Sequence, residues 1–169
     1  MTNKQVAECF ASNREHTCHS LHVFNDVHTI FSYGSHFPIA KKTSLFDDDG
    51  KRIVFFTTRD YSVTTSSHKS DVRWALHQNG FRIVEVHNVE AINRQAIDDL
   101  TAQQNEAQGK AERARKQWSK ESWQVKFRQC KDDASLLTRL FDNQALTAQQ
   151  FIKFSEFPTL YKRREFHKL

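Results

Sequence analysis

The sequence has no long apolar run. No stretch approaches the roughly 18 apolar residues that a membrane span needs, and residues 1–11 lack the basic start and apolar centre of a signal peptide. Because of these absences, we expect neither an integral membrane protein nor a secreted protein. We predict a cytoplasmic protein that makes no membrane contact.

Cysteine is scarce, and its distribution excludes a disulfide framework. The three cysteines, Cys9, Cys18 and Cys130, form an odd set without a CxxC pair. Such a set is typical of reduced thiols inside a cell. We therefore expect all three thiols to be free.

The sequence also lacks a recognisable metal motif. His16, Cys18, His19 and His22, with Cys9 upstream, carry the nitrogen and sulfur donors that zinc prefers. Their spacing matches no standard zinc knuckle, and the segment around His22 is expected to be extended rather than helical. We expect ordinary core or surface histidines here and no metal.

No catalytic motif accompanies the other histidines. His36 and His68 lie near several hydroxyl residues, at position 35 and at positions 64–67, but no GxSxG elbow is present. Serine and threonine ahead of a helix are also what N-capping requires. The sequence therefore predicts no catalytic residue, no cofactor and no enzymatic activity.

The composition is that of one folded domain with an appendage. The chain has 169 residues, 27% charged residues and a mean hydropathy of −0.71, while fourteen phenylalanines supply bulk for a core. We predict a core domain over residues 1–100 and a basic helical arm over residues 101–169, a helical hairpin plus a short tail.

The pattern of the first hundred residues predicts an α+β fold, with a small antiparallel-rich sheet and one or two packed helices. A short helix is expected over residues 3–10. The expected strands are 20–24, 27–33, 37–40, 52–58 and 81–86, with turns at Asn25-Asp26 and at 47–50. A helix capped by Ser66, Ser67 or Ser70 should end at Gly80, and Asn88 should cap a long helix.

The arm begins where the composition changes to Ala, Gln, Glu, Lys and Arg. Ala107, Ala111, Ala114, Trp118 and Val125 repeat at heptad spacing and predict a narrow helix seam. Its partner is either the segment 136–141 of the same chain or the seam of a second copy, which would make a homo-oligomer. The glycine at position 109 is either a hinge or a mere interruption of the helix, and a short last helix is expected to be capped by the threonine at position 147.

Positive charge is concentrated in the arm. Residues 110–131 contain eight Lys or Arg and two acids, a net charge of +6, whereas the whole chain carries +5. One interpretation is a solvated helix face. The other is a surface for a polyanion or an acidic protein.

Two segments resemble a family of small uncharacterised bacteriophage proteins. They are SYGSHFPIA at 32–40 and YSVTTSSHK at 61–69, and they differ from the family pattern at Ser67, where the family has Lys before the histidine. The resemblance covers less than a third of the chain and supplies no catalytic residues. It implies a viral origin, a location in the host cytoplasm, and binding to nucleic acid or to a host protein.

The candidate binding residues combine basic and aromatic side chains, which can contact phosphates and stack on bases. They are Arg113, Arg115, Lys116, Lys120, Trp123, Lys126 and Arg128 of the arm, with Lys69 and Arg73 at an expected helix start. Trp118 is expected to pack in the seam. We predict a non-enzymatic accessory protein that binds nucleic acid. The alternative is an anti-defence inhibitor that occludes an acidic host protein.

Overall fold

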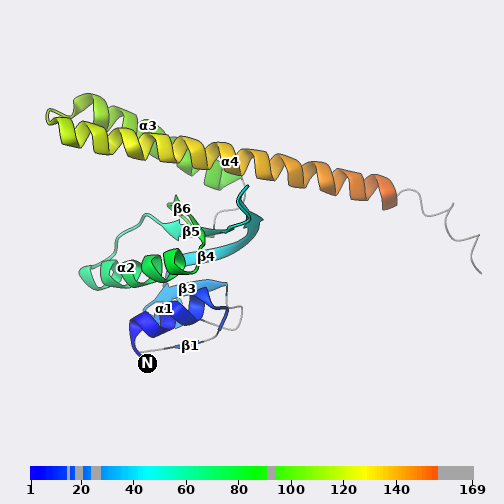
Figure 1. Cartoon of the computed structure of the whole chain (residues 1–169), viewed down its shortest axis with the longest axis horizontal. Helices are drawn as coiled ribbons and strands as arrows, with labels where there is room; N and C mark the ends of the chain where they lie inside the picture. The colour runs from blue at the N-terminus through cyan, green and yellow to red at the C-terminus, as the bar shows by residue number, and fades with distance from the viewer. Residues whose placement is uncertain (15, 18–20, 24–27, 91–93, 156–169) are drawn as a thin grey trace, which may run out of the picture.

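The computed structural model describes residues 1–14, 16–17, 21–23, 28–90 and 94–155 (Figure 1). The helices are α1 (Asn3–Ala11), α2 (Val63–Gln78), α3 (Arg94–Arg113) and α4 (Gln117–Ser155). The strands are β1 (His16–Thr17), β2 (Leu21–Val23), β3 (Thr29–Ser32), β4 (Phe37–Phe46), β5 (Arg52–Thr57) and β6 (Arg82–Val86). A sheet-forming region with two helices is followed by the two long helices α3 and α4, so the α+β prediction is confirmed.

The strands form one sheet in the order β1-β2-β3-β4-β5-β6. Every pair from β1 to β5 is antiparallel, and only β5 and β6 are parallel. A parallel pair needs a crossover connection, which α2 supplies between them. The expected antiparallel-rich sheet is therefore present, with one parallel pair at its edge.

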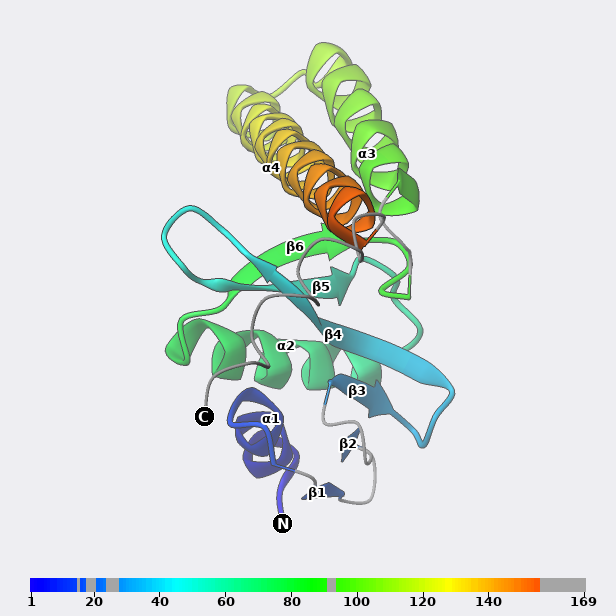
Figure 2. The same cartoon turned by 90° about the vertical axis from the view of Figure 1, so that its right-hand side faces the viewer.

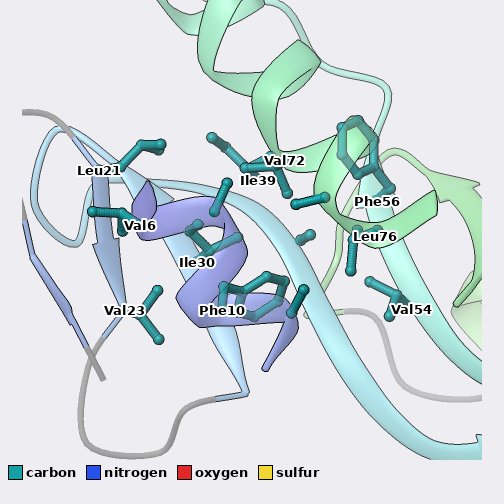
Figure 3. Close-up of a cluster of buried hydrophobic side chains, with 14 of the residues drawn as sticks. Val6, Phe10, Leu21, Val23, Ile30, Ile39, Val54, Phe56, Val72 and Leu76 are labelled. Carbon is teal, nitrogen blue, oxygen red and sulfur yellow. The ribbon is translucent and has the colours of Figure 1, made fainter. Parts of the chain in front are cut away.

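The first core lies between the sheet and helices α1 and α2 (Figure 3). Val6 and Phe10 of α1 are fully buried, as the apolar stripe of that segment predicts. They meet Val72 and Leu76 of α2 and Phe56 of β5 in the same cluster. Both helices cover one face of the sheet.

The second core lies on the opposite face of the sheet, under α3 and α4 (Figure 2). Ile53 of β5 and Val84 of β6 alternate with the residues that face the first core. They pack with Leu100 of α3 and Leu137 of α4. The two helices are therefore docked on the sheet, and α3 runs without a break through residue 101, where the composition changes.

α2 begins earlier than the predicted caps Ser66, Ser67 and Ser70, so that prediction is wrong. Ser62 is the N-cap, and its side chain accepts a hydrogen bond from the Thr65 amide. Ser66 and Ser70 lie inside the helix, where their hydroxyls donate to backbone carbonyls four residues earlier. The predicted end at Gly80 is correct, since this residue has the positive φ of 73° that terminates a helix.

α3 and α4 form an antiparallel hairpin, so Ala107 and Ala111 lie on a helix that packs against α4 of the same chain (Figure 1). The expected partner segment 136–141 packs instead in the second core with Leu100. Ala107 and Ala111 are buried, but the chain leaves the helix after residue 113 and re-enters it at residue 117. The heptad pattern does not continue across this turn. Trp118 and Val125 are consequently exposed at 68% and 55%, and the expected core role of Trp118 is wrong.

Gly109 lies inside a continuous α3, so it does not interrupt the helix. Two smaller predictions in the helical region are also wrong. α4 extends to Ser155 without a separate last helix starting near residue 147. Asn88 accepts a hydrogen bond from the Glu90 amide in a local turn, so it is not a helix cap. The Asn25-Asp26 turn, Cys18, His19 and the tail from 156 lie outside the described residues.

Candidate functional site

The structure divides the nine sequence-predicted residues among three surfaces. We define the hairpin tip as Arg113, Arg115, Lys116, Trp118 and Lys120, at the turn between α3 and α4. Four others, Lys69, Arg73, Trp123 and Lys126, line a cavity beside the parallel strands. Arg128 lines a separate groove, to which Arg73 also contributes.

The hairpin tip presents unopposed positive charge. Its four basic side chains are all exposed, and residues 113–120 contain no acid. Within residues 28–90 and 94–143, none of these four side chains forms an ion pair. Cations without acidic partners are free to neutralise an incoming anion.

Trp118 adds an aromatic surface to this charge. The Lys116 ammonium lies over its ring, 6.0 Å from the ring centroid. The turn at residues 114–116 places the indole at the first turn of α4, where it is 68% exposed. An exposed tryptophan beside unpaired cations is a combination that binds nucleic acids or acidic protein surfaces.

The cavity lies at the carboxyl ends of β5 and β6, between α2 and the hairpin. It has a volume of about 630 Å³. Its lining includes four cations and four carboxylates, which are Lys69, Arg73, Lys110, Lys126, Asp60, Glu85, Asp99 and Glu106. The opposite charges are equal in number, so the lining of this cavity as a whole carries no net charge.

Ion pairs account for most of these charges. Lys69 donates to the Asp60 carboxylate at 2.8 Å, and Arg73 and Lys126 bind the two oxygens of Glu85 at 2.6 Å and 2.5 Å. Burial by itself would raise the pKa of Glu85, but the hydrogen bonds and charges of Lys126 and Arg73 outweigh it and lower this pKa. Glu85 is thus a stable anion between two cations.

The anion site expected at the start of α2 is not formed. The segment 66–70 is the interior of the helix, so its amides bond within the helix. Lys69 is turned back to the Arg59 carbonyl as well as to Asp60.

The groove lies between α2, β6 and α4 and has a volume of about 600 Å³. Its charged lining is Lys51, Arg73, Arg82 and Arg128, with a single carboxylate, Asp132. Arg82 is paired with Asp133, Arg73 with Glu85 and Lys51 with Asp49, so among the described residues Arg128 is the lining cation that has no ion pair. Phe81, Ile83 and Val125 supply an apolar part of the wall.

Arg82 anchors the groove to the protein interior. It donates to the buried Asp133 carboxylate at 2.5 Å. Burial raises the pKa of Asp133, and the hydrogen bond and charge of Arg82 oppose this shift. Within the described chain, the Arg82 Nε atom is buried and has no hydrogen-bond partner.

The two segments that carry the phage resemblance meet in space. Ser32 and His68 are both buried, with the Ser32 oxygen 2.8 Å from His68 Nδ1. Tyr33, at a positive φ of 56°, places its ring 5.7 Å from the His68 ring. Burial lowers the pKa of His68, while Asp71 opposes the shift. The Ser32–His68 contact therefore links α2 to β3 in the protein interior.

The described residues contain no group of three or more His, Cys, Asp or Glu side chains that could hold a metal ion. His16 and His22 lie on the neighbouring strands β1 and β2. Cys9 and Cys130 are buried free thiols. Burial raises the pKa of the Cys130 thiol, which keeps it protonated.

Comparison with known proteins identifies no family for this chain. No protein-family model matches the chain, and no curated protein or solved structure matches it. The resemblance to phage proteins therefore stays a prediction. Among the described helices, none is long and apolar enough to cross a membrane.

Sequence reasoning missed three residues of these surfaces. Lys51 and Arg82 come from the sheet region, and no local pattern marks them as neighbours of Arg128. Trp118 was assigned to the seam because residues 114–116 contain neither Gly nor Pro, the usual signals of a turn.

Proposed function

We propose that this protein binds nucleic acid through the hairpin tip. The observation that carries the proposal is the exposed Trp118 among four basic side chains that have no acidic partner in the described chain. Such cations displace counterions from phosphates, and an exposed indole stacks on an unpaired base, which contributes about 1–3 kcal/mol.

The structure also separates the tip from the other predicted residues. Lys69, Arg73 and Lys126 already neutralise carboxylates, and Lys110 pairs with Glu106 at 2.6 Å. We therefore assign them a supporting role, in holding α2, β6 and the hairpin together. Binding is assigned to the side chains that are both basic and unpaired.

Fluorescence anisotropy with labelled single- and double-stranded DNA and RNA tests this proposal. The tip variant carries R115E, K116E and K120E, and a second variant carries W118A. At about 0.1 M salt we expect the charge variant to lose about 100-fold in affinity, because each lost phosphate contact costs about five-fold at this concentration. W118A should lose binding to single strands more than to duplexes.

A matched control variant carries K4E, R14E and K131E. These three side chains are exposed and lie outside the tip, and the substitutions change the net charge by the same amount. Equal losses in the tip and control variants would overturn the assignment to the tip. No binding of the native protein to any nucleic acid would overturn the proposed function and favour an acidic protein partner.

A further inference from the structure

One face of α4 connects the tip to the groove. Trp118, Val125 and Gln129 follow one another at spacings of seven and four residues, which places them on one side of the helix. Trp118 lies at the tip, whereas Val125 and Gln129 line the groove. From position 118 to position 128 the helix rises about 15 Å, at about 1.5 Å per residue.

Charge along this face favours an anion in the groove. Arg128 is exposed and its Nε donates to the Gln124 carbonyl at 3.4 Å, while its lining neighbour Arg73 shares Glu85 with Lys126. Asp132 is the carboxylate of this lining. The cluster of Arg73, Lys126 and Glu85 therefore keeps an excess of one positive charge. Arg82 keeps a buried Nε–H without a partner in the described chain.

We propose that a single nucleic-acid strand runs from Trp118 along α4 into the groove, where the exposed Arg128 and Lys51 contact its phosphates. This inference rests on the proposed function and extends the binding surface to a second contact region. The apolar wall formed by Phe81 and Val125 can contact the faces of unpaired bases, which a duplex does not expose.

The length of this path predicts how many nucleotides the bound single strand needs. About 15 Å corresponds to roughly four or five stacked nucleotides at about 3.4 Å per nucleotide. A strand of four nucleotides therefore falls just short of this path, whereas a strand of eight nucleotides is longer than the path and can occupy both the tip and the groove. Glu121 is an acid on this path, and its carboxylate accepts a hydrogen bond from Gln117 at 2.8 Å.

Binding of labelled single strands of 4, 8, 12 and 16 nucleotides, at two salt concentrations, tests the path. The groove variant carries K51E and R128E; both side chains are exposed, and Lys51 forms an exposed ion pair with Asp49 at 3.7 Å. We expect native affinity to rise up to about eight nucleotides. The groove variant should bind four nucleotides normally and twelve nucleotides about 25-fold more weakly at about 0.1 M salt, the cost of two contacts.

Two further variants make the test independent of folding defects. The control R14E with K131E has the same net charge and should bind all lengths like the native protein. E121K should bind twelve nucleotides about five-fold more tightly, a gain that misfolding cannot produce.

Each remaining outcome overturns a defined part of the proposal. If the groove variant keeps the native length dependence and E121K gains nothing, the path is wrong while the tip assignment stands. If a twelve-base-pair duplex binds as tightly as the single strand and is equally weakened by the groove variant, the single-strand assignment is wrong. If the native protein binds no strand of any length, the proposed function fails as well.

Discussion

At the scale of single residues, Lys42 is unusual because it is a buried cation. It lies on β4 with only 3% exposure, and its ammonium donates to the Phe10 carbonyl and, at 2.8 Å, to the Asn13 side chain. It also lies over the Phe10 ring, 4.4 Å from the centroid. These contacts place a positive charge at the carboxyl end of α1, where the helix dipole favours it.

Burial lowers the pKa of Lys42 to about 8, and the charge of Arg52 adds to the shift. In the unfolded chain this pKa is about 10.4. Between these two values the unfolded chain binds more protons than the folded protein, so Lys42 makes stability rise with pH in this window. The gain is at most roughly 3 kcal/mol.

Urea unfolding at about pH 7.5 and pH 10 checks this prediction for the native protein and for K42M. The free energy of unfolding of the native protein should rise relative to that of K42M as pH increases. K131M, at an exposed lysine, should show no such relative change. A native protein that loses stability relative to K42M over this range would contradict the lowered pKa.

At the scale of elements, α2 depends on a cap that sequence pattern did not identify. The hydroxyl-rich run around it offers many candidates for the N-cap, and a capping side chain is recognised by its backbone conformation, not by its identity. Ser62 is extended, at φ −157° and ψ 168°, and bonds the Thr65 amide. Ser66 and Ser70 lie inside the helix and therefore cannot be its N-cap.

We expect S62A to reduce the free energy of unfolding by about 1 kcal/mol, the usual contribution of an N-cap. S66A and S70A should have little effect or stabilise slightly, because alanine is the better helix former. Chemical denaturation of the three variants measures the difference. A larger loss in S66A or S70A than in S62A would place the helix start where the sequence pattern predicted it.

At the scale of the whole molecule, the hairpin and the sheet share one core. Leu137 of α4 is fully buried against residues of β5 and β6, and Arg139 binds Asp48 of the β4–β5 turn at 2.7 Å. The proposed nucleic-acid surface is therefore held by a packed interface, so the tip and the groove keep a defined separation.

This shared core predicts that L137A destabilises the sheet as well as the hairpin. The loss should be about 2–5 kcal/mol, because the substitution leaves a cavity in the core. Hydrogen exchange should show the loss of protection in both α2 and α4, whereas V125A, at an exposed position, should change neither. Loss of protection in α4 alone would mean that the arm unfolds as a separate unit.

The sequence by itself determined the local elements. The α1 stripe, the β4–β5 turn at Gly50 and the end of α2 at Gly80 follow from periodicity and from residues that tolerate positive φ, which depend only on near neighbours along the chain. The same reasoning identified the basic and aromatic residues of the arm, because composition is a local property.

Only the tertiary structure decided which of those residues are available for binding. Lys126 meets Glu85, which is 41 residues earlier, and Arg82 meets Asp133, which is 51 residues later. No sequence pattern specifies such pairs, because they depend on how the hairpin packs on the sheet. The turn at 114–116 likewise moved Trp118 from the expected core to the surface, since chain reversal breaks the heptad pattern that predicted its burial.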